Sequence, residues 1–142
     1  MASPRKLFSW EGIAAEYATF QIDNSTITYD VDQAGGAAAV GSAVNLSAAE
    51  TVQLAGDGGA VLGKLIKVEE DDTCTVQTRG FMQLPGGTGA SLTLGKSIVG
   101  AASATPTDGY IREVATATAA ELGLCRGIIV DAGTTTAVWV LL

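Results

Sequence analysis

Turn signals recur along this chain at intervals of roughly 8–12 residues, which leaves room only for short strands between them. The signals are rich in glycine, as in "GDGG" at residues 56–59 and "PGGTGA" at residues 85–90. The 142 residues include 18 glycines and only 3 prolines, a usage that suits many tight turns and little helix. We therefore predict an all-β fold, a compact domain of the β-sandwich or barrel-like kind.

Apolar and polar residues alternate between these turns, as they do in half-buried strands. Leu92 and Leu94, for example, would share one strand face. The predicted strands cover residues 50–56, 60–68, 73–84, 91–100, 108–115, 126–133 and 134–142, with a turn around 131–133 in the closing pair. One short helical insert is also predicted, because Thr118 and Glu121 have capping-box spacing and Gly123 can end the helix.

The first part of the chain has a different pattern, and we predict an extended N-terminal arm over residues 1–33 and a β-rich domain over residues 34–142. The early part of the arm is open to a short helix capped by Ser9, whereas residues 19–31 favour two extended pieces separated by "DNS". The small residues at 33–43 predict a flexible linker into the domain. The alternative for this stretch is a segment packed where larger side chains do not fit.

Four acidic residues, Glu69–Asp72, lie between two predicted strands. Four residues are a suitable length for a hairpin loop, and a run of like charges usually marks solvent. The alternative is a cation site, but the run lacks the D-x-[DN]-x-[DN]-G pattern of a calcium loop. We therefore predict an exposed and hydrated hairpin tip.

The chain contains no histidine, which excludes Ser-His-Asp and Cys-His nucleophilic systems and histidine-based zinc sites. Its two cysteines, Cys74 and Cys125, form no CxxC pair; Cys74 is predicted to be a small buried hydrophobe, and a bridge between the two stays open. The glycine-rich runs do not make a phosphate loop, because Ala90 stands where the first glycine of the motif before Gly95 is needed. We predict no catalytic residue, no metal and no cofactor, although a Ser-Lys or carboxylate-pair enzyme remains formally open.

The net charge of −7, from 15 acidic and 8 basic residues, argues against a nucleic-acid partner, which would need clustered lysine and arginine. No run of about 18 apolar residues is present, so we expect no membrane partner. Without a reactive centre, the function is expected to lie in a contact surface and its assembly.

A longer pattern joins these features. The pattern begins with a small-residue lead-in and a short strand, "GSAVNLSAAETVQLAGDGG". The stretch "AVLGKLIKVE" follows, and then a further strand, "CTVQTRGFMQL", which ends at a proline-glycine turn. "GYIREV" and the terminal "GIIVDAGTTTAVWVLL" continue the pattern. In this order of strands and turns, the body of the chain resembles the capsid decoration, or cement, proteins of tailed bacteriophages. Residues 1–33 fall outside the resemblance.

The resemblance implies a virion protein on the outer surface of the capsid, which binds the major capsid protein, forms a homotrimer and stabilises the head against internal pressure. Aromatic and arginine residues are favoured interface anchors, which suggests shell contacts within the arm. The expected capsid contacts are Arg5, Lys6, Phe8, Trp10 and Tyr17. Packing of Phe8 and Trp10 onto their own domain is the alternative, and Trp139 is expected in the core or in the trimer interface.

Two other functions remain open at the level of the sequence. A ligand-binding or enzymatic small β-barrel would need a deep apolar pocket with converging polar groups. A head-fibre base would differ from a decoration protein mainly in what is attached to it. We expect a protein that is not an enzyme.

Overall fold

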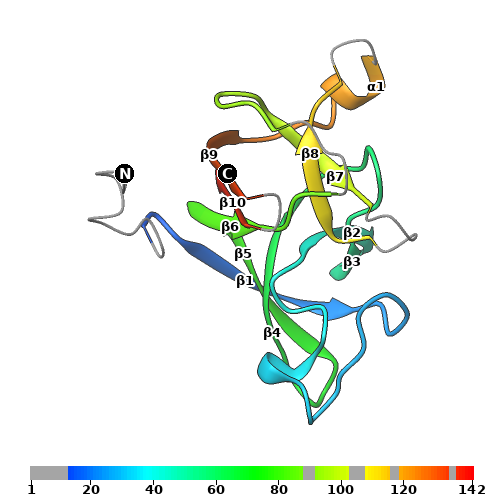
Figure 1. Cartoon of the computed structure of the whole chain (residues 1–142). Helices are drawn as coiled ribbons and strands as arrows, with labels where there is room; N and C mark the ends of the chain where they lie inside the picture. Colours follow the sequence, from blue (N-terminus) through cyan, green and yellow to red (C-terminus); the bar gives the residue numbers. More distant parts are fainter. Residues whose placement is uncertain (1–12, 88–91, 103–107, 116–118, 135–136) are drawn as a thin grey trace.

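The computed structural model describes residues 13–87, 92–102, 108–115, 119–134 and 137–142 (Figure 1). Strands dominate these residues, so the prediction of an all-β fold is confirmed. The strands are β1 (Glu16–Ile22), β2 (Ala43–Ala48), β3 (Thr51–Leu54), β4 (Gly63–Val68), β5 (Thr73–Arg79), β6 (Phe81–Leu84), β7 (Ile98–Ala101), β8 (Tyr110–Glu113), β9 (Ile128–Thr134) and β10 (Ala137–Leu141). The helical elements are the 3-10 turn η2 (Ala34–Gly36) and the short helix α1 (Ala119–Leu122).

Five of the strands close into a barrel in the order β1-β3-β2-β4-β5, with β5 returning to β1. The pairing of β1 with β3 is parallel, and the other neighbouring strands are antiparallel. Closure gives every barrel strand two neighbours, so these strands present no free edge to solvent. The core of the barrel is formed by the buried residues Ile22, Ile27, Ala37, Val44, Val52, Leu65, Val68, Cys74 and Val76.

A second layer packs at one end of the barrel, above β4 and β5 in the view of Figure 1. It consists of a three-stranded sheet in the order β6-β10-β9 and the two-stranded sheet β7-β8. Isolated bridges from Gly86 to Ile111 and from Ile98 to Arg126 tie these sheets to the neighbouring segments. The second core is formed by Ala43, Ala55, Val61, Met82, Leu84, Ile98, Ile111, Ile129, Val138 and Val140.

Much of the segment predicted as an N-terminal arm belongs to the barrel. β1 pairs with β5 from Glu16 to Gln21, and the following residues Ile22 and Ile27 are buried in the barrel core. Part of the predicted arm is therefore a strand of the barrel, and the helix considered from a Ser9 cap does not extend through β1. The reason is physical: β1 is held by partners far along the chain, which the local pattern does not reveal. Residues 1–12 of the predicted arm lie outside the described residues.

The stretch predicted as a flexible linker is packed instead. Ala37 and Ala43 are buried, and a Cβ built on Gly36 would lie 2.0 Å from the carbonyl oxygen of Val68. Gly36 also has a φ of 88°, in the region that favours glycine. The small residues between 33 and 43 are thus explained by close approach to β4, which was the alternative interpretation.

Other elements depart from the predicted bounds in informative ways. The predicted strand over residues 73–84 is divided at Gly80, which has a φ of 97°. The next residue, Phe81, begins β6 in the second layer. Leu94 is exposed in a turn, and the strand expected there begins only at Ile98. β9 continues through Asp131, where a turn was predicted. The short helical insert is confirmed at Ala119–Leu122.

Candidate functional site

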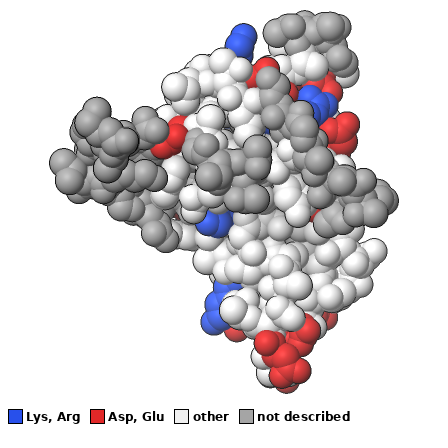
Figure 2. Space-filling view, in the orientation of Figure 1, with Lys and Arg blue, Asp and Glu red and all other residues white. Residues whose placement is uncertain are grey.

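The acidic run forms the tip of the β4–β5 hairpin, as predicted. The Glu69 N–H donates to the Thr73 carbonyl at 2.8 Å and closes the turn. Lys67 Nζ lies 2.7 Å from Glu69 Oε1, and the pKa of Asp71 is lowered by hydrogen bonds from the hydroxyl and N–H of Thr73. Figure 2 shows acidic side chains gathered at the lower tip of the molecule, the end at which this hairpin turns. The carboxylates thus face separate local partners or solvent and do not converge on a common point.

Neither the acids nor the cysteines form a metal site in the part of the chain that the structure describes, where no three such side chains are grouped to hold an ion. Cys74 is buried in the barrel core, as predicted, and this burial raises the pKa of its thiol. Cys125 lies after α1 and donates its S–H to the Leu122 carbonyl at 3.3 Å. Both cysteines are free, so the bridge between them does not form.

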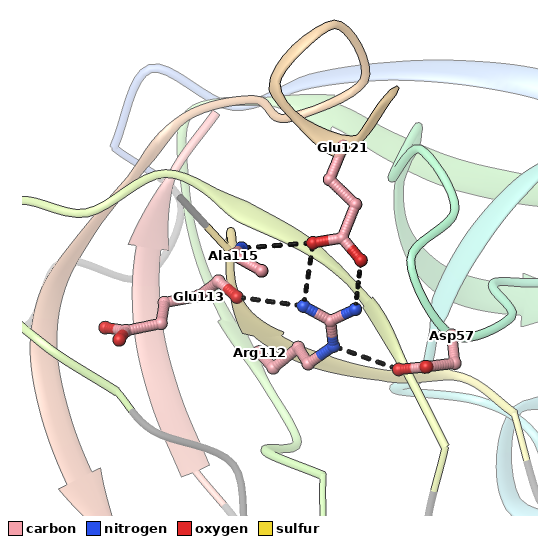
Figure 3. Close-up of polar contacts among 5 residues, drawn as sticks. All are labelled: Asp57, Arg112, Glu113, Ala115 and Glu121. Carbon is pink, nitrogen blue, oxygen red and sulfur yellow. Dashed lines mark hydrogen bonds and ion pairs between the residues drawn. The ribbon is translucent and has the colours of Figure 1, made fainter. Parts of the chain in front are cut away.

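Arg112 on β8 is bonded to two carboxylates (Figure 3). Its Nε donates to Asp57 Oδ1 at 2.9 Å, and its Nη1 donates to Glu121 Oε2 at 3.0 Å and to the Glu113 carbonyl at 3.2 Å. Glu121 also accepts from the Ala115 N–H at 3.0 Å. The hydrogen bonds with Glu121 raise the pKa of Arg112, and those from Arg112 lower the pKa of Glu121. Glu121 was expected to cap its own helix, whereas its carboxylate bonds to Arg112 on β8 and to the Ala115 N–H, and Arg112 in turn reaches Asp57 after β3.

Two of the expected contact residues line the same groove. Tyr17 on β1 is 56% exposed, and Trp139 on β10 is half-buried. The groove has a volume of about 210 Å³ and is lined by Tyr17, Lys64, Ile66, Gln77, Phe81, Met82, Gln83 and Trp139. The other four expected contacts, Arg5, Lys6, Phe8 and Trp10, lie outside the described residues. The structure therefore brings together one residue assigned to the shell contact and the residue assigned to the trimer interface.

A second hollow lies next to the groove. It has a volume of about 350 Å³, shares Lys64 and Gln83 with the groove and extends to Tyr110 and Pro85. Aromatic side chains therefore line both hollows, with Tyr17, Phe81 and Trp139 in the groove and Tyr110 in the second hollow. Sequence reasoning identified neither hollow, because their walls come from strands whose packing the sequence leaves open.

Gln77 at the floor of the groove is the buried polar residue that sequence reasoning missed. It is only 5% exposed, and its Nε2 donates to the carbonyls of Arg79 at 3.2 Å and Phe81 at 3.0 Å. Strand alternation points Gln77 out of the barrel, opposite Cys74 and Val76. The second layer covers that outer face, which explains why Gln77 is buried.

A separate pocket lies around Arg126, with a volume of about 250 Å³ and a largely apolar wall. The residues that line it are Asn45, Leu46, Ala60, Val61, Leu62 and Arg126. Burial, and to a smaller extent the charge of Arg79, lowers the pKa of Arg126. Asn45 Oδ1 is buried and accepts no hydrogen bond from the described residues, a state that costs about 1–3 kcal/mol when it is not relieved.

No protein-family model, curated protein or solved structure matches this chain. Within the described residues, no helix has the length and apolar character needed to cross a membrane.

Proposed function

We propose that this chain is a capsid decoration protein that binds the outer surface of an assembled phage head and stabilises it. The observation that carries the proposal is the groove shared by Tyr17 and Trp139, because two side chains selected for interface chemistry meet there. The resemblance in the order of strands and turns supports the same function.

The position of the groove fits a role in binding an extended partner segment. Ile13, the first described residue, accepts a hydrogen bond through its carbonyl from the Phe81 N–H at 3.1 Å, and Phe81 lines the groove. The described part of the chain therefore begins beside this groove. Tyr17 would anchor the shell contact from the body of the protein, since aromatic residues are favoured interface anchors.

Stabilisation of the shell would follow from mass action. A protein that binds the assembled lattice and not its separated subunits stabilises the lattice by RT ln(1 + [L]/Kd) at each site. A homotrimer that bridges neighbouring copies of the major capsid protein adds such contributions without needing high affinity at each contact. The proposed trimer contact is Trp139, at the edge of the same groove.

Co-sedimentation with empty heads of tailed phages tests the proposal, scored for saturable binding and delayed thermal rupture. The decisive variants are a deletion of residues 1–12 and Tyr17→Ala; the deletion ends before Glu16 so that β1 remains intact. Both should weaken binding while the melting temperature of the protein stays unchanged. Val31→Ala is the control, because Val31 is also an exposed apolar side chain and lies outside the groove. Absence of saturable binding by the full chain would refute the function.

Light scattering tests the assembly state separately. We expect a trimer, or a monomer that becomes trimeric on the shell, and Trp139→Ala should weaken the association. A dimer that is stable both free and on the shell would contradict the proposed assembly.

A further inference from the structure

The pocket around Arg126 has no role in the proposed shell contact, and it lies apart from the groove in its lining residues. Asn45 and Leu46 come from β2, Ala60 to Leu62 come from the segment that leads into β4, and Arg126 precedes β9. The pocket thus forms where the barrel meets the second layer, and it combines one guanidinium with apolar walls.

The hydrogen bonds of Arg126 leave part of its donor capacity unused. Its Nη1 donates to the carbonyls of Leu62 and, at 3.4 Å, of Val61, and its Nη2 donates to the Thr78 carbonyl. A guanidinium has five N–H donors, so the Nε–H and a second hydrogen on Nη2 have no partner in the described part of the chain. All the acceptors found are neutral carbonyls.

The contrast with Arg112 shows what is missing at Arg126. Arg112 has two carboxylates, Asp57 and Glu121, within hydrogen-bond distance. No carboxylate of the described residues lies within ion-pair distance of Arg126, and the neighbouring charge of Arg79 is positive. A half-buried cation without an anion, beside apolar side chains, is a site at which a carboxylate would find an unneutralised charge and free N–H donors.

We propose that this pocket binds a carboxylate carried on a short apolar chain, with Arg126 as the charged contact. The planar guanidinium suits a carboxylate better than a single-point cation would, because it can donate two parallel hydrogen bonds. Leu46 and Leu62 provide contact for the apolar chain. Asn45 adds a polar group on the wall, and its soft χ2 lets the amide turn to meet a ligand.

The size of the pocket limits the ligand. Its volume of about 250 Å³ is below the range of roughly 300–1,000 Å³ that is typical of sites for drug-sized molecules. A group of the size of one acidic side chain with its apolar neighbour is therefore the natural occupant. Two sources carry this chemistry: an acidic segment of a protein partner and a free short-chain carboxylic acid.

Nuclear magnetic resonance of the arginine Nε–Hε groups in the full chain tests the proposal. The titration is run at moderate salt, which limits the repulsion between the anionic ligands and a protein with a net charge of −7. Butyrate should shift the Arg126 resonance in a saturable manner, whereas butyramide, which is matched in size but neutral, should not. The resonances of Arg79 and Arg112 serve as internal controls and should show no saturation.

A peptide arm of the same titration distinguishes the two sources. Acetyl-Leu-Glu-Leu-amide is compared with its Gln counterpart and with butyrate. If the Glu peptide binds at least about tenfold more tightly than butyrate, an acidic segment of a protein is the ligand. If butyrate binds as tightly as the peptide, the site serves free carboxylates. Both outcomes support a carboxylate site.

Variants show whether Arg126 and the pocket are responsible. Arg126→Gln should abolish the saturable binding, but it also removes bonds to three carbonyls and is at risk of misfolding. Leu46→Glu avoids this risk, because Leu46 is 54% exposed and lines the pocket, so its new carboxylate would occupy the site from within the chain. We expect Leu46→Glu to weaken butyrate binding at least about tenfold and the size-matched Leu46→Gln to change it less than about twofold.

The proposal would be overturned by any of three results. These are absence of saturable binding for butyrate and the Glu peptide alike, equal binding of butyramide or the Gln peptide, and equal losses in Leu46→Glu and Leu46→Gln. None of these results bears on co-sedimentation with phage heads, so the two proposals can fail independently.

Discussion

Arg112 on β8 and Glu121 on α1 form a two-point ion pair in which both guanidinium Nη atoms meet the two carboxylate oxygens (Figure 3). The side chains are only 22% and 15% exposed, and Arg112 also holds Asp57 in the turn after β3. One guanidinium therefore joins the barrel, the two-stranded sheet and the short helix. Partly buried geometry of this kind makes the pair more stabilising than an ordinary surface ion pair.

Glu121→Gln should lower the melting temperature at neutral pH, because it removes the charge from this ion pair. The pKa of Glu121 is lowered in the folded protein, chiefly by the hydrogen bonds from Arg112. Its contribution is therefore complete above the ordinary pKa of 4.5 and is lost as the pH falls through the lower pKa of the folded state. Melting curves of the wild type and the variant should converge in acid. Glu70→Gln, at the exposed hairpin tip, is the control; an equal loss in both variants would contradict the role of the pair.

Gly63→Ala should destabilise the protein by about 2–3 kcal/mol through overpacking. A Cβ on Gly63 would lie 2.0 Å from the backbone oxygen of Gln77, and neither backbone can move away without breaking the pairing of β4 with β5. Gly123→Ala is the matched control, since its Cβ would meet the Ala120 oxygen at an ordinary 3.6 Å. Urea denaturation compares the two variants. Equal stability would mean that β4 and β5 are less closely packed than described.

Asp72→Val should be less stable than Asp72→Gly by about 1–2 kcal/mol, because Asp72 has a φ of 64° at the hairpin tip and a branched side chain is strained there. Both variants lose the hydrogen bond from Asn24 Nδ2 to Asp72 Oδ2, at 3.1 Å. Their difference therefore isolates the backbone conformation from the side-chain contact. Thermal melting of the two variants provides the measurement. A valine variant that is more stable than the glycine variant would contradict the positive φ at Asp72.

Cys125 should react with a thiol reagent much faster than Cys74 in the native protein. Cys74 is 1% exposed in the barrel core, and its raised pKa further reduces the reactive thiolate. Two thiols should react in denaturant without a reductant, because both cysteines are free. Equal native rates, or fewer than two thiols in denaturant, would be inconsistent with the structure. Cys125→Ser identifies the fast site.

The local pattern of the sequence was a good guide to several elements. The Gly-rich turn at residues 56–59, the hairpin around Glu69–Asp72 and the helix near Glu121 all lie where turn and capping chemistry predict them. Each depends on neighbours within a few residues, so the information is contained in a short stretch. The burial of Cys74 followed from strand alternation for the same reason.

The candidate sites were less predictable. Tyr17 and Trp139 were selected for their chemistry, but nothing in their sequence positions indicated a common groove. Gln77 and Arg126 were not identified at all, because their burial depends on which layer covers the outer face of the barrel. A residue that alternation directs toward solvent becomes buried when a second sheet packs over it.

The sequence by itself determined the all-β class, most of the turns and the short helix, because backbone preference and side-chain alternation act over a few residues. Tertiary structure alone decided that residues 16–22 are a barrel strand, that the small residues near Gly36 are packed, and that Arg126 has no anionic partner among the described residues. These features depend on contacts between distant segments, whose pairing a linear pattern does not specify.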